Sequence, residues 1–298
     1  MIAPWLWIVF TIGAALLQTI RNALQRGLTG PLGAQGATLV RFFYGLPFGV
    51  LFLGIILAAT GHAPVLPGPI AVLWTFAGAL AQIGATLLLL MAMRDRSFVV
   101  VTAYSKTEPV QVAIFGLVLL GDHLTLPITL AIIVATVGVV LMSWPKQRGE
   151  TPFTWRGSVY GIASAALFGI ASVCFRGAIL TLSGAGYLVA ASTILVLTLL
   201  IQTAVFSGYL LIRDPGVLRA VIREWRPSLP AGFAGALASQ GWFLAFALES
   251  AARVRTLGLA EILFAQILAY RIFRQNAGWR EWAGIALIVV GVIWLLNG

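Results

Sequence analysis

Long apolar runs, separated by short polar clusters, make up most of this 298-residue sequence. A helix needs about 20 apolar residues to cross about 30 Å of hydrocarbon, because it rises about 1.5 Å per residue. The runs show no alternation suited to a membrane barrel. The sequence therefore predicts an all-α membrane protein with about ten transmembrane helices, which we place at residues 5–24, 38–59, 69–91, 98–120, 125–143, 157–179, 187–212, 229–248, 254–269 and 282–296.

The composition fits this interpretation. Hydrophobic residues make up 60% of the chain and charged residues only 9%, whereas a soluble domain carries about 25% charged residues. The first run has no basic region before it and no small-residue cleavage site after it, so we expect a helix of the mature protein and not a removable signal. Cys174 is the single cysteine, which excludes an intramolecular disulfide and a cysteine metal cluster.

The formal net charge of +10 does not indicate a nucleic-acid partner, because the basic residues fall singly or in pairs between apolar runs. Among the predicted connections, all but Arg176, Arg253 and Arg255 collect on one side of the membrane. The positive-inside rule makes that side cytoplasmic. This charge count predicts both termini outside.

An internal repeat divides the chain. The hexapeptide at residues 76–81, Phe-Ala-Gly-Ala-Leu-Ala, recurs at residues 233–238. Further matches occur in the same order along both halves. Arg26-Gly27 matches Arg176-Gly177 before the hexapeptide, and Gly84 with Gly241 and Val137-Gly138-Val139 with Val290-Gly291-Val292 match after it. We predict five-helix halves at residues 1–144 and 157–298, joined by a polar linker at 145–156. An odd number of helices makes the second half inverted, and transporters built this way bind substrate near the midplane, in a central cavity between the halves.

This organisation resembles the drug/metabolite transporter superfamily, in particular its EamA-type members. Further similarity lies in Arg41-Phe42 at the second helix, in the Gly-Asp-His-Leu-Thr corner at residues 121–125, and around Gly138 and Gly291. The resemblance implies a secondary transporter, from a family that moves amino acids, nucleotide sugars, quaternary amines and other metabolites. Two features depart from it: many relatives have cytoplasmic termini, and residues 274–276 replace the corner in the second half.

Candidate binding residues cluster on the fourth predicted helix. Before Pro109 come Thr102, Tyr104, Ser105, Lys106, Thr107 and Glu108. Pro109 cannot donate to the carbonyl of Ser105, so we expect a kink that frees this carbonyl beside an acid and a base. Ionisable groups at this depth indicate function by default. The alternative is that Lys106 and Glu108 belong to a structural charge network.

The repeat adds a second acid. The offset that aligns Gly138 with Gly291 also aligns Glu108 with Glu261. Two such carboxylates would approach the cavity from opposite sides and could couple transport to protons. The alternative for Glu261 is an ion pair with Arg21 or Arg41.

Polar residues on other helices complete the candidate site. Gln18, Arg21, Asn22 and Gln25 lie on one face of the first helix, which must meet protein or water. Arg21 could instead reach the cytoplasmic interface. Gln82 on the third helix, with Gln240 and Trp242 on the eighth, could bind or stack on a ligand, although Trp242 and Phe243 could equally face core or lipid.

The sequence thus predicts a secondary transporter of a small polar or zwitterionic metabolite in the cell's inner membrane. An amino acid or related compound is the preferred substrate, export the preferred direction, and proton coupling an option. The alternatives are a transporter of drugs, quaternary amines or nucleobases, and a non-transporting scaffold. We expect no enzyme, because no nucleophile–base pair is recognisable, and no cofactor or metal. We expect no partner beyond the substrate and the lipid bilayer. A monomer is possible as the transporting unit, because both halves lie in one chain.

Overall fold

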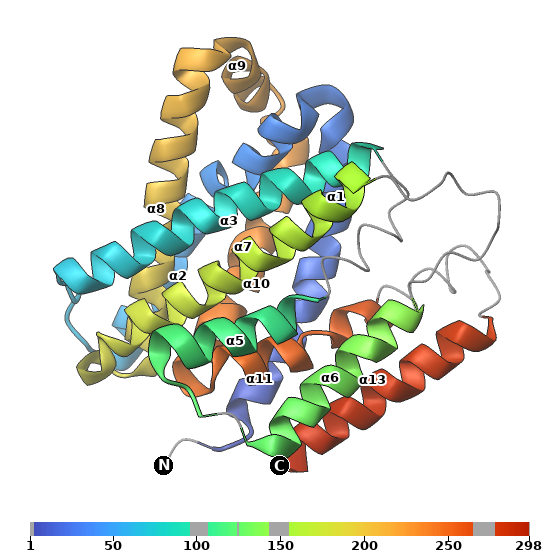
Figure 1. Cartoon of the computed structure of the whole chain (residues 1–298). Coiled ribbons are helices and arrows are strands. Elements are labelled where there is room, and N and C mark those ends of the chain that lie inside the picture. Colours follow the sequence, from blue (N-terminus) through green and yellow to red (C-terminus); the bar gives the residue numbers. More distant parts are fainter. Residues whose placement is uncertain (1–2, 96–106, 124, 143–154, 265–277, 298) are drawn as a thin grey trace. The chain divides into compact units, whose positions relative to one another are not determined.

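The computed structural model describes residues 3–95, 107–123, 125–142, 155–264 and 278–297 (Figure 1). Every regular element within these ranges is a helix, which confirms the prediction of an all-α fold. The helical segments long and apolar enough to cross a bilayer are Leu6–Thr60, Pro69–Met91, Val159–Leu180, Tyr187–Arg213 and Trp225–Leu248.

The first two predicted helices are longer than expected and follow each other almost without a connection. Helix α1 is assigned to Leu6–Phe43 and α2 to Leu46–Thr60. Inside α1, Gly33 has φ 65° and ψ 178°, which divides it into two helical arms. Glycine tolerates this conformation because it has no Cβ. The runs 6–32 and 34–60 therefore each form one arm of about 40 Å, enough to cross a bilayer.

The other helices follow the predicted runs, with one addition. A short helix, α9, lies between residues 212 and 229, where the sequence predicts a connection between two spanning helices. The bounds of the helices after α2 are α3 Pro69–Asp95, α5 Glu108–Leu120, α6 Leu126–Met142, α7 Trp155–Leu180, the 3-10 turn η1 Ser183–Ala185, α8 Tyr187–Arg213, α9 Pro215–Arg223, α10 Trp225–Leu248, α11 Ala251–Leu257 and α13 Trp279–Asn297.

Two predicted helices have boundaries in the structure that differ from the prediction. Helix α5 begins only at Glu108, after a turn at Thr107, so Pro109 lies in a first turn and not at a mid-helix kink. Proline suits that position because its missing N–H has no partner to lose there. In the second half, α11 ends at Leu257 and the helical backbone resumes at Ala260, with Glu261 N–H donating to Gly258 O at 3.0 Å.

The described chain forms two compact units that do not coincide with the halves of the sequence. One unit contains Met1–Ile83 and Cys174–Glu249, and the other contains Gly84–Val173 and Ser250–Gly298. Each unit therefore combines helices from both halves of the repeat. The repeat boundaries themselves, and a cavity between the halves, stay predictions.

Packing within the second unit is reciprocal between the repeats. A Cβ atom placed on Gly138 of α6 would lie 2.7 Å from Gly284 O and 2.8 Å from Leu287 Cβ of α13. A Cβ atom placed on Gly291 of α13 would lie 2.7 Å from Ala135 N and 2.9 Å from Ala131 O of α6. Each glycine thus meets the turns preceding the other glycine. A contact that maps onto itself in this way is the signature of two-fold symmetry.

The repeated hexapeptide has equivalent neighbours in its two copies. In the first copy, a Cβ atom on Gly78 of α3 would meet Phe175 of α7 at 2.7 Å. In the second copy, a Cβ atom on Gly235 of α10 would meet Arg21 of α1 at 3.3 Å. Helices α7 and α1 are the first helices of their halves, so each third helix packs its repeated glycine against the first helix of the other half. This supports the inverted repeat.

These contacts generate a stability prediction. Gly138→Ala and Gly291→Ala each force a methyl group against backbone atoms, so we expect each to destabilise the protein by about 1–3 kcal/mol. Gly54→Ala is the matched control, because nothing lies within 4 Å of a Cβ atom there, and alanine favours the helix. Thermal unfolding in detergent measures the difference. Equal melting temperatures for Gly138→Ala and Gly54→Ala would contradict this close packing.

Candidate functional site

A buried ion pair joins α5 and α11 in the second unit. Arg255 Nε lies 3.1 Å from Glu108 Oε1, and the two side chains are only 9% and 14% exposed. A charge buried without a counter-charge is costly, so the two side chains compensate each other's burial. The sequence led us to expect a basic group near Glu108. In the structure, Arg255 of another helix supplies it.

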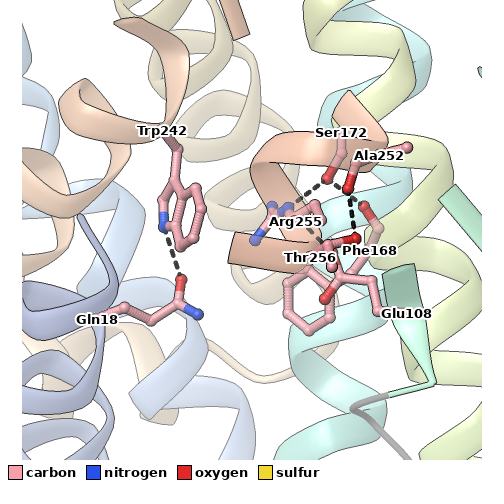
Figure 2. Close-up of polar contacts among 8 residues, drawn as sticks. All are labelled: Gln18, Glu108, Phe168, Ser172, Trp242, Ala252, Arg255 and Thr256. Atoms are coloured by element: carbon pink, nitrogen blue, oxygen red, sulfur yellow. Dashed lines mark hydrogen bonds and ion pairs between the residues drawn. The ribbon is translucent and has the colours of Figure 1, made fainter. Parts of the chain in front are cut away.

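A serine from a third helix completes this cluster (Figure 2). The single N–H of Arg255 Nε donates to Ser172 Oγ of α7 at 2.9 Å. Ser172 Oγ in turn donates to Phe168 O at 2.8 Å. Beside Arg255, the hydroxyl of Thr256 donates to Ala252 O within its own helix at 2.7 Å. The cluster thus presents an acid, a guanidinium and a hydroxyl from three helices.

The local sequence explains why these groups meet. Glu108 is the first residue of α5, where the exposed N–H groups and the helix dipole stabilise a carboxylate. One turn before Ser172, a Cβ atom on Gly169 would lie 3.3 Å from Phe115 and Val112 of α5, so the glycine allows α7 to approach closely. Ser250 starts α11 by accepting a hydrogen bond from Arg253 N at 3.4 Å, which sets the register of Arg255.

Glu261 occupies the equivalent position in the second repeat. It is buried, and it lies in the first turn after the helical backbone resumes at Ala260. Its neighbours Leu259 and Ile262 belong to an apolar cluster with Ala135, Val139 and Ile288. The two acids that the repeat aligns therefore share one structural feature: each lies in the first turn of a helical segment.

Polar residues predicted on the first and eighth helices meet in the first unit. Trp242 Nε1 donates to Gln18 Oε1 at 3.0 Å, between α10 and α1 (Figure 2). Asn22 Oδ1 accepts from Arg21 Nη2 at 2.7 Å. Trp242 is only 4% exposed, so among the alternatives for this residue a lipid-facing position is excluded. The structure thus joins Gln18 and Trp242 by a hydrogen bond, and their role in substrate binding stays a prediction.

Gln82 and Gln240 both bond to α8. Gln202 Nε2 donates to Gln82 Oε1 at 2.8 Å, and Gln240 Nε2 donates to Ser192 Oγ at 2.8 Å. All four side chains are buried. Sequence analysis missed Gln202 and Ser192, although a glutamine in the middle of an apolar run was a usable signal.

The buried arginines correct the charge count. Arg21 and Arg41 are 3% and 4% exposed, so Arg21 does not extend to an interface. Arg176 lies within α7, where Nη1 donates to Phe246 O at 2.8 Å and also to Glu249 O. Arg253 and Arg255 belong to α11. The orientation of the termini stays a prediction, because the described arginines counted on the more basic side are helical as well.

Part of the predicted site lies outside the described residues: Tyr104, Ser105 and Lys106, together with Thr102. Sequence analysis missed Arg255, which it counted in a connection between helices, and Ser172, which it did not single out. Within the described ranges no group of three or more potential metal-ligating side chains occurs.

Comparison with known proteins finds a family similarity in the first predicted half. A model of the EamA-like transporter family, which is part of the drug/metabolite transporter superfamily, matches residues 5–144. Together with the apolar helices, this similarity supports a multi-pass membrane protein. A comparison with curated proteins found no match.

The fold is also similar to that of another protein, known from a crystal structure. The two chains share 18% sequence identity, with a TM-score of 0.73 over 97% of this chain and 94% of the other. At this identity the similarity concerns the fold alone.

The Glu108–Arg255 pair yields an energetic prediction. Glu108→Gln or Arg255→Gln leaves one buried charge without its partner, so each is expected to destabilise the protein by about 3–5 kcal/mol. The double variant should lose less than the sum, with a coupling energy of about 1–3 kcal/mol. Denaturant unfolding of the four proteins measures the cycle. Strictly additive losses would show that the two side chains do not interact.

Proposed function

We propose that this transporter exports an amino acid or a related zwitterionic metabolite across the inner membrane by alternating access. The observation that carries the proposal is the Glu108–Arg255 ion pair, held beside Ser172 at the start of a helix. It offers one anion and one cation about 3.1 Å apart, which matches the two opposite charges of a zwitterion.

Charge balance supports a zwitterion over the other substrate classes. A substrate carboxylate can accept paired hydrogen bonds from the guanidinium of Arg255, while its ammonium group replaces Arg255 as the partner of Glu108. Both protein charges then remain paired when their mutual contact opens. A quaternary amine would satisfy Glu108 but leave Arg255 unbalanced, and a neutral nucleobase would balance neither charge.

The same pair offers a route for proton coupling. A proton bound to Glu108 removes its negative charge, so Arg255 becomes available to a substrate carboxylate. A proton leaving Glu108 restores the ion pair and favours release of the substrate. Glu261, buried at the equivalent position of the other repeat, is the second proposed coupling site.

Transport by the purified full chain tests this proposal. In liposomes with an imposed pH gradient, we expect gradient-dependent uptake of an amino acid from a panel of labelled amino acids, amines and nucleobases. Loss of one charge-assisted hydrogen bond is worth about 1.5–3 kcal/mol, so Glu108→Gln and Arg255→Gln should lower uptake about 10- to 100-fold. Glu261→Gln should reduce the dependence on the gradient.

Arg253→Gln provides the matched control, because Arg253 lies on the same helix but donates to Leu295 O at 3.1 Å. It should retain uptake if folded protein is recovered. Gradient-dependent uptake that is unchanged in Glu108→Gln and Glu261→Gln would refute the coupling assignment. Uptake restricted to amines or nucleobases would refute the zwitterion assignment.

A further inference from the structure

Helix α9 differs from the spanning helices in length and composition. It has nine residues, Pro215–Arg223, and connects α8 to α10 at one end of both (Figure 1). Asp214 caps its start by accepting from Val217 N at 3.3 Å. Because α8 and α10 are both long and apolar enough to span the bilayer, the helix that joins their ends lies at the level of the lipid headgroups.

The two sides of α9 have opposite chemistry. Val217 and Val221 contact Gly36 of α1, each 3.3 Å from a Cβ atom placed there, and Tyr44 donates to Val221 O at 3.0 Å. Four residues apart, Arg219 and Arg223 lie on the other side of the helix, since each residue turns about 100°. One face therefore anchors α9 to the protein and the other carries exposed arginines.

Apolar and aromatic side chains accompany these arginines. Ile222 is 53% exposed, and Trp225 is 49% exposed with the guanidinium of Arg226 5.4 Å from its ring centroid. An amphipathic helix with arginines on its polar side and exposed tryptophan and isoleucine beside them is typical of segments that lie in the interface of a membrane. Arg223 Nε lies 3.6 Å from Glu224 Oε1, but the Arg223 side chain is 79% exposed, so solvent weakens this contact.

We propose that α9 and the residues around it, from Arg213 to Arg226, form a binding surface for the headgroups of anionic phospholipids. The guanidinium groups of Arg219 and Arg223 bind lipid phosphate, while Ile222 and Trp225 contact the acyl-chain boundary. Guanidinium groups bind phosphate through paired hydrogen bonds. Bound lipid would hold α9 against the membrane at the point where α8 and α10 connect.

Native mass spectrometry of the purified full chain tests the proposal. Phosphatidylglycerol or phosphatidylcholine is added to the detergent-solubilised protein, and the dissociation constant of the first bound lipid is measured. The wild-type chain should prefer phosphatidylglycerol. Each arginine near an anionic membrane contributes about fivefold in affinity, so Arg219→Gln/Arg223→Gln should weaken phosphatidylglycerol binding about 25-fold.

Two comparisons make the result specific to α9. Arg219→Lys/Arg223→Lys keeps the charges and should retain most of the affinity. Arg280→Gln should leave lipid binding unchanged. This variant removes an exposed arginine whose guanidinium lies 5.6 Å from the ring of Trp279, a contact similar to that of Arg226 with Trp225. The proposal is overturned if phosphatidylcholine binds equally well, if the double glutamine variant binds like wild type, if Arg280→Gln loses as much, or if inorganic phosphate displaces the lipid.

Discussion

An ion pair buried between two helices places the strongest constraint on this structure. Glu108 and Arg255 are each too costly to bury alone, so α5 and α11 must present them to each other. Ser172 extends the constraint to α7. The backbone obeys the same rule, because groups freed where α5 begins and α11 ends must find partners within the protein. Charge and helix interruption therefore occur at the same place, and this place is our candidate site.

The predicted repeat aligns this site with a second position in the other half, and the two positions differ in their charged residues. Reciprocal contacts of Gly138 and Gly291 relate the fifth helices of the two halves, and the same offset relates Glu108 to Glu261. Arg255 has no such counterpart, because the offset that pairs the glutamates pairs it with Thr102. The acids are duplicated and the guanidinium is not. A substrate with one carboxylate and one ammonium group fits that asymmetry.

Local features made most of the fold predictable from the sequence. The length of an apolar run determines whether it can span a bilayer, so most predicted helices match the structure closely, as α8 at Tyr187–Arg213 does. The sequence predicts a kink at Pro109, not the start of α5 at Glu108, and it gives no sign of the turn at Gly258, where the apolar run continues. Contacts such as Trp242 with Gln18, or Arg255 with Glu108, join residues far apart in the chain. Their residue types were visible, but their partners depend on tertiary packing.

The central claim is that Arg255 and Glu108 together bind a zwitterion. Equilibrium binding of an amino acid and of the amine formed by its decarboxylation, measured for wild type and Arg255→Gln, tests it most directly. The wild-type protein should prefer the amino acid by about tenfold or more, the value of one charge-assisted hydrogen bond. In Arg255→Gln that preference should disappear, while binding of the amine through Glu108 persists. An undiminished preference for the amino acid in Arg255→Gln would contradict the account.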